Sequence, residues 1–198
     1  MARFVVFLTL LSLASCATLS PPGEISPTME LRLENLDSWQ LSGKLGYRSR
    51  HEAGSAWLDW QQQSDHFQLS LSGPFGAGAT RIEGTDTAAV LIRSGEPPIS
   101  ASSPEALTAQ LFGWVWPVDE LLSWVKGIPS PASTASFIDK DSSGRLVQLH
   151  QAGWKLSFAD YVQTDNDLVL PGKIIGTRDD LRFTLLIKSW QLENADDG

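Results

Sequence analysis

The chain has 198 residues, with 15 Lys and Arg against 23 Asp and Glu, and a net charge of −8 at neutral pH. This acidic balance, without a basic run anywhere, argues against a nucleic-acid partner. It also argues against electrostatic attachment to an anionic lipid surface, so membrane attachment should come from acyl chains. The length suits one domain with a single core.

The amino terminus has the features of an export signal. Arg3 precedes an apolar stretch from Phe4 to Ala14, which is too short to span a bilayer. Cys16, the only cysteine, ends the run Leu-Ala-Ser-Cys, which resembles the bacterial lipoprotein box. In that box the cysteine sulfur receives diacylglycerol, the signal is cut before it, and the new amino terminus is acylated. The alternative is an ordinary signal peptide with a buried thiol.

These features divide the chain into three parts. Residues 1–15 are predicted to be the lipoprotein signal peptide, residues 16–28 a flexible tether lipidated at Cys16, and residues 29–198 a single domain. The tether is rich in Pro, Ser and Thr, a composition that resists helix and strand alike. Structure is expected to begin near Met29, in a short helix with Met29, Leu33 and Leu36 on one side.

Most of the remaining chain alternates between polar and apolar residues, which predicts half-buried strands. The alternation begins at Trp39 and runs to Tyr47. It returns in later stretches: Ala56 to Trp60, Phe67 to Leu71, Val90 to Ile92, Val147 to Leu149, Trp154 to Phe158 and Leu181 to Ile187. Turn-forming residues separate the first runs at hairpin spacing, so we expect an antiparallel meander.

Two short helices interrupt the strands. The first has Ser103 as a plausible N-cap and Pro104 at the first helical position. The second begins at Pro117 and ends before Gly127, and its apolar residues fall at i, i+3, i+4 and i+7. Strands on both sides of a helical pair predict an α+β domain, in which a curved antiparallel sheet carries the helices on one face.

Motifs for catalysis or metal binding are missing from the sequence. His51, His66 and His150 lie in different segments, and none has metal-ligand spacing to another His or Cys. No serine occupies a G-x-S-x-G elbow, and the one cysteine is assigned to lipid attachment. We therefore predict a protein that is not an enzyme and that holds neither a metal nor another cofactor.

A glycine-rich loop, Gly-Pro-Phe-Gly-Ala-Gly at residues 73–78, separates two predicted strands. A dinucleotide fingerprint would require a further glycine at position 81, which is Arg81. What remains is a large apolar side chain, Phe75, on a loop with few other side chains. Phe75 either folds back into the core or is displayed for burial in something apolar.

Eight tryptophans are spread over the predicted strands and helices. They could fill a core, as buried aromatic residues usually do. An open sheet that curves beneath two short apolar helices, however, tends to leave a cavity, and such cavities take lipids or other apolar ligands. The residues alone leave both possibilities open.

Several short motifs, taken together behind the lipoprotein box, resemble the LolB family of outer-membrane lipoprotein receptors. The resemblance extends from Trp39 to Trp190. The motifs that show it are Trp39 to Gly46, Ser55 to Trp60, Leu71 to Gly76, Ser103 to Leu107, Gly113 to Pro129, Gly153-Trp154, Leu170-Pro171 and Ile187 to Trp190.

The resemblance implies an unclosed β-barrel in which the short helices form a lid over an apolar cavity. It implies that the protein accepts acylated lipoproteins from the periplasmic carrier LolA and inserts them into the inner leaflet of the outer membrane. The protein would be a lipid-anchored monomer that faces the periplasm, and Ala17 after the cysteine resembles the outer-membrane sorting pattern. The alternative function is a non-catalytic envelope scaffold with a dry core.

The resemblance also implies site residues. Gly73, Pro74, Phe75 and Gly76 match the family's protruding membrane-insertion loop, with Phe75 where the family often has leucine, which favours display of this side chain. The candidate acyl-chain cavity consists of Trp57, Leu58, Trp60, Leu69, Leu71, Trp116, Leu121, Trp124, Trp154 and Leu185.

Overall fold

The computed structural model describes residues 23–192 except 74, 75, 77, 113 and 114. The expected signal peptide, Cys16, Pro74 and Phe75 lie outside these residues. Eleven strands form one sheet in which every pairing is antiparallel. Their bounds are β1 Ser38–Arg48, β2 Ala53–Gln63, β3 His66–Ser72, β4 Thr80–Thr85, β5 Ala88–Arg93, β6 Ile99–Ala101, β7 Phe137–Lys140, β8 Leu146–Gln151, β9 Trp154–Ala159, β12 Lys173–Arg178 and β13 Leu181–Leu192.

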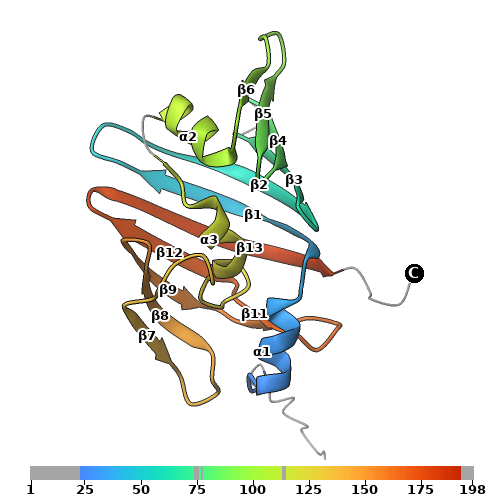
Figure 1. Ribbon diagram of the computed structural model, residues 1–198, viewed down its shortest axis with the longest axis vertical. Helices are drawn as coiled ribbons and strands as arrows, with labels where there is room; N and C mark the ends of the chain where they lie inside the picture. Colours follow the sequence, from blue (N-terminus) through green and yellow to red (C-terminus); the bar gives the residue numbers. More distant parts are fainter. Residues whose placement is uncertain (1–22, 74–75, 77, 113–114, 193–198) are drawn as a thin grey trace, which may run out of the picture.

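The order of the strands places the first strand beside the last (Figure 1). It runs β6-β5-β4-β3-β2-β1-β13-β12-β9-β8-β7, so β1 and β13 pair in the middle while β6 and β7 form the two edges. The edges do not pair with each other, and the barrel is therefore unclosed. Two further strands, β10 Val162–Gln163 and β11 Val169–Leu170, pair separately. The predicted α+β class with an open antiparallel sheet is confirmed.

The first helix, α1, spans Pro27–Glu34 and begins two residues before Met29. The Ser26 hydroxyl accepts a hydrogen bond from the Met29 amide at 3.2 Å, and Pro27 occupies the first turn. The Ile25 amide donates to the Ser143 carbonyl at 2.8 Å. Residues 25–28, which the sequence placed in the tether, are therefore attached to the folded domain.

The other two helices, α2 Pro104–Phe112 and α3 Val118–Trp124, lie on one face of the sheet (Figure 1). The Ser103 hydroxyl accepts a hydrogen bond from the Ala106 amide at 3.1 Å, which confirms the predicted N-cap. Pro117 precedes α3 as expected, and Gly127 follows its end with a φ of +75°. A left-handed φ of this kind is what favours glycine after a helix.

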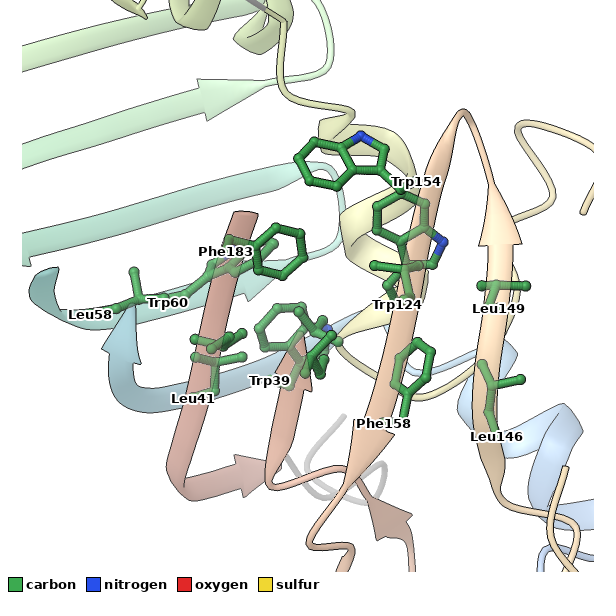
Figure 2. Packing of buried hydrophobic residues seen from close by; sticks show 14 residues of the cluster. Trp39, Leu41, Leu58, Trp60, Trp124, Leu146, Leu149, Trp154, Phe158 and Phe183 are labelled. Carbon is green, nitrogen blue, oxygen red and sulfur yellow. The ribbon is translucent and has the colours of Figure 1, made fainter. Parts of the chain in front are cut away.

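The main core lies between α3 and the sheet (Figure 2). Its buried side chains come from both halves of the chain: Trp39, Leu41, Leu58, Trp60, Trp124, Val125, Leu146, Leu149, Trp154, Leu156, Phe158, Ile174, Phe183 and Leu185. A smaller cluster holds α1 through Leu33, Ile128, Leu168 and Leu170. Half-buried Leu36, Trp190 and Leu192 pack against both clusters and so connect α1 to the main core.

Candidate functional site

A cavity of about 200 Å³ lies between the concave face of the sheet and the two helices α2 and α3. The sheet contributes Leu45, Tyr47, Ala56, Leu58, Trp60, Phe67, Leu69, Leu71, Ile82, Phe183 and Leu185, while Pro104, Leu107, Thr108, Trp116, Val118, Leu121 and Val125 cover them. No Asp, Glu, Lys, Arg or His is among these lining residues.

The alternation of the strands explains which side chains reach the cavity. Residues two apart on a strand share a face, and β2 therefore presents Ala56, Leu58 and Trp60 to the interior. On α3, Val118, Leu121 and Val125 fall at i, i+3 and i+7, which places them along one side of the helical segment. The helix α2 is held over the sheet by Leu107, which packs against Ala89 and Leu91.

Two polar side chains that line the cavity, Trp60 and Thr108, form hydrogen bonds within the protein. The Trp60 indole Nε1 donates to the Gln62 side-chain oxygen at 3.3 Å. The Thr108 hydroxyl donates to the Glu105 carbonyl at 2.9 Å and accepts from the Trp116 amide at 3.1 Å. Because a charged group buried here would find no counter-charge among the lining residues, the cavity suits a hydrocarbon ligand.

Seven of the ten predicted cavity residues line this cavity: Leu58, Trp60, Leu69, Leu71, Trp116, Leu121 and Leu185. Trp57 does not, because alternation along β2 turns it to the opposite face from Leu58 and Trp60, where it is 50% exposed. Trp124 and Trp154 do not line it either, and both are buried in the core.

Specific contacts hold these two tryptophans in the core. The Trp124 indole Nε1 donates to the Gln151 side-chain oxygen at 2.8 Å, which holds the ring against β8. Trp154 packs behind the cavity wall, with ring centroids 5.9 Å from Trp116 and 5.3 Å from Phe183. The Arg178 guanidinium lies over the Trp154 ring at 4.9 Å. The buried Nε1 of Trp154 has no hydrogen-bond partner among the described residues.

Several lining residues were not among the predicted ones, although the strand pattern contained the signal. Leu45 and Tyr47 alternate on β1, Phe67 shares its face with Leu69 and Leu71, and Phe183 shares its face with Leu185. The alternation of side chains along each strand was therefore sufficient to identify these lining residues once the concave face was known.

The glycine-rich loop begins directly beyond the cavity wall. Leu71 on β3 lines the cavity, and Gly73 follows two residues later. The Gly76 amide donates to the Gly73 carbonyl at 3.1 Å, and Gly76 has a φ of +78°. Of the predicted insertion loop, the described residues Gly73 and Gly76 thus follow shortly after the cavity-lining Leu71 in the chain.

Within the described part of the chain, His, Cys, Asp and Glu form no group of three or more that could hold a metal ion. No described helix combines the length and apolar character needed to cross a membrane.

The comparisons with known proteins agree with this architecture. Residues 37–190 match the family model described as "Outer membrane lipoprotein LolB". The chain is 40% identical to the outer-membrane lipoprotein LolB of Cellvibrio japonicus, with 95% of each chain covered. It is 43% identical to that of Stutzerimonas stutzeri, with 91% of each covered.

Two solved structures share the fold. A LolA superfamily protein from Nitrosomonas europaea has a TM-score of 0.52 and 9% identity, over 82% of this chain and 89% of that one. A DUF1329 family protein from Desulfovibrio piger has a TM-score of 0.54 and 5% identity, over 85% of this chain and 92% of that one. With the family model and the relatives in agreement over most of its length, the chain belongs to the LolB family of outer-membrane lipoproteins.

Proposed function

We propose that this protein accepts acylated lipoproteins from the periplasmic carrier LolA and inserts them into the inner leaflet of the outer membrane. Its own acylated Cys16 anchors it there as a monomer that faces the periplasm. The observation that supports the proposal most strongly is the apolar cavity, in a chain of the LolB family, whose described lining residues include no charged side chain.

The energetics of acyl chains explain why such a cavity is needed. Exposing one methylene to water costs about 0.8 kcal/mol, so a chain of about fifteen costs on the order of 12 kcal/mol. Free diffusion of an acylated protein across the periplasm is therefore negligible, and the chains pass from cavity to cavity. Net transfer follows if the receiving cavity, or the bilayer beyond it, binds the chains more tightly than the donor does. The hand-over makes and breaks no bond, so the proposal assigns no catalytic residue.

The cavity is tested by placing a charge in its wall. Leu69→Glu on β3 puts a carboxylate among apolar side chains, and we expect at least a tenfold loss of binding of an apolar fluorescent probe, because an unpaired buried charge costs several kcal/mol. Gln61→Glu on β2 is the matched control, because it lies on the face opposite Trp60 and its cross-strand neighbours, Gln40 and Gln68, are uncharged. Transfer of acylated cargo from loaded LolA should fall in the first variant only. An absence of saturable probe binding by the parent protein would instead favour a scaffold.

The membrane-insertion role of residues 73–76 is part of the same proposal. Burying a phenylalanine side chain in an apolar medium is worth about 1.5 to 3 kcal/mol. We therefore expect Phe75→Glu to slow the entry of loaded cargo into liposomes by about tenfold or more, with probe binding by the cavity unchanged. Phe75→Leu keeps the apolar bulk and serves as the control. Normal cargo entry in the glutamate variant would show that the tip has another role.

A further inference from the structure

Five basic side chains gather on the convex face of the sheet, opposite the cavity. Leu45, Tyr47 and Phe183 point into the cavity, so alternation directs Lys44, Arg48 and Arg182 to the other face. The same rule applies to Lys155 on β9 and Lys173 on β12, whose neighbours Leu156 and Ile174 belong to the core. We refer to Lys44, Arg48, Lys155, Lys173 and Arg182 as the basic face.

The strand register sets these residues in two rows. One row crosses four neighbouring strands and consists, in order, of Arg48, Arg182, Thr177 and Lys155. The other row runs from Lys173 through Leu186 and Lys44 to Trp57. The rows are four residues apart, about 13 Å, and the strands from β9 to β1 span about 14 Å.

The basic face differs from most of the other described cations in having no anionic partner, although the Lys44 ammonium lies over the Trp57 ring. Apart from Lys188, the other described cations are engaged: Arg50, Arg81, Arg93, Lys140 and Arg145 form ion pairs, and Arg32, Lys126 and Arg178 donate to backbone carbonyls. The five residues of the basic face form no ion pair with any described residue. The two rows and the row between them hold no Asp or Glu.

This arrangement is unfavourable for the isolated sheet. Like charges directly opposite each other on neighbouring strands are destabilising, and Arg48 and Arg182 are such a pair. The chain has more Asp and Glu than Lys and Arg, with a net charge of −8, yet none of its described carboxylates pairs with the basic face. An unpaired cationic surface on an acidic protein is complementary to an anionic partner.

We propose that the basic face binds the headgroups of anionic phospholipids at the bilayer surface. Trp57, half exposed, adjoins the Lys44 ammonium at 5.9 Å, and tryptophan favours the membrane interface. Trp57 also pairs with Ser72, the residue before Gly73, so the end of this row lies at the base of the glycine-rich loop. An exposed indole next to that loop favours a lipid surface over an acidic protein. The acidic composition, without a basic run, argued against such attachment, because the five residues come from four different strands and form no run in the sequence.

Vesicle binding tests this proposal without involving cargo, so its outcome is separate from that of lipoprotein transfer. The protein used is the whole mature chain with Cys16→Ser, which exchanges one atom outside the described residues and removes the acyl anchor. Its binding to phosphatidylcholine vesicles is compared, by co-sedimentation at low and high salt, with binding to vesicles containing one third phosphatidylglycerol. We expect binding to the anionic vesicles alone, and its loss at high salt.

The decisive variant is Arg48→Gln with Arg182→Gln. A basic residue near an anionic surface strengthens binding by about fivefold, so we expect this pair of changes to weaken vesicle binding by about 25-fold. The matched control, Arg32→Gln with Lys140→Gln, removes the same charge from α1 and β7. Thermal unfolding shows whether the first variant is folded, and we expect it to unfold no earlier than its parent because a like-charge pair is removed.

Equal loss of vesicle binding in the two double variants would overturn the proposal, since net charge alone would then explain it. Unchanged vesicle binding in the Arg48 and Arg182 variant would also overturn it. If that variant then took cargo from LolA more slowly, the basic face would be a docking site for an acidic protein.

Discussion

At the scale of single residues, Gln151 is a buried polar residue whose side chain forms four hydrogen bonds in the core. Its side-chain oxygen accepts from the Trp124 indole at 2.8 Å and the Ser130 amide at 2.9 Å. Its side-chain nitrogen donates to the carbonyls of Ser130 at 2.7 Å and Ser133 at 2.6 Å. All hydrogen-bonding positions of this amide are therefore used, and they join β8 to α3 and to the segment after it.

Replacing Gln151 by Leu should cost about 3 kcal/mol or more in the free energy of unfolding. The substitution leaves several buried donors and acceptors without partners, and each such group costs about 1 to 3 kcal/mol. Urea unfolding followed by tryptophan fluorescence measures the change. Gln163→Leu, at an exposed position where the amide contacts Asp167, should cost less than about 0.5 kcal/mol. A small effect at Gln151 would mean that water replaces the lost bonds.

The roles of individual residues were only partly predictable. Strand alternation already separates Trp57 from Leu58 and Trp60, so aromatic character was a poorer guide to the cavity than position. Trp124 is different, because it lies on a helix and its burial depends on Gln151, 27 residues later in the chain. A partner at that distance leaves no local pattern in the sequence.

At the scale of elements, Lys126 connects the end of α3 to the end of α1. Its ammonium donates to the carbonyls of Glu34 at 3.3 Å and Leu36 at 3.1 Å, which would otherwise lack partners after the last turn of α1. The residue is 8% exposed. Burial lowers the pKa of Lys126 below its usual range, although the charges of Asp37 and Glu34 partly oppose this effect.

The lowered pKa predicts a pH-dependent stability that Lys126→Met abolishes. Between the folded pKa and the ordinary value of 10.5, the unfolded chain binds the proton more tightly than the folded chain does. Stability contributed at this site therefore rises with pH across that window. We expect the unfolding free energy of the parent to increase relative to Lys126→Met from neutral pH to about 10.5, measured by urea titration. Lys140→Met, on β7, is the control, and a constant difference across this range would contradict the prediction.

The boundaries of the helices illustrate what local signals can specify. Ser103 followed by Pro104 correctly marked the start of α2, and its capping hydrogen bond is present. The same pair of residues occurs at Ser26 and Pro27, where α1 begins. That start was predicted two residues too late because the surrounding proline-rich composition suggested a tether. The docking of Ile25 to Ser143, more than 100 residues away, has no counterpart in the local sequence.

At the scale of the whole molecule, the fold class was predictable and the strand order was not. Two-residue periodicity and tight turns indicate hairpins, and hairpins account for the pairing from β1 to β6. The pairing of β1 with β13 joins Trp39 to Leu192, and no turn specifies it. The register of β1 and β13 is fixed only by the burial of their concave-side residues in one shared core.

Because the core is shared, the two halves of the sheet should unfold together. Trp39 and Trp60 from the first half are in one cluster with Trp154 and Phe183 from the second. We expect a single cooperative transition in urea, with coincident curves from tryptophan fluorescence and far-ultraviolet circular dichroism. Two separated transitions would mean that the halves are independent units, contrary to the packing.

The central position of β13 also bears on how the chain reaches its folded state. Until residues 181–192 are available, β1 has only β2 as a neighbour, and β12 has only β9. Each half then presents an unpaired inner edge, which is a template for intermolecular pairing. Contacts this distant in sequence also form slowly. A chain of this topology is therefore most prone to intermolecular strand pairing before its last strand, β13, has joined the sheet.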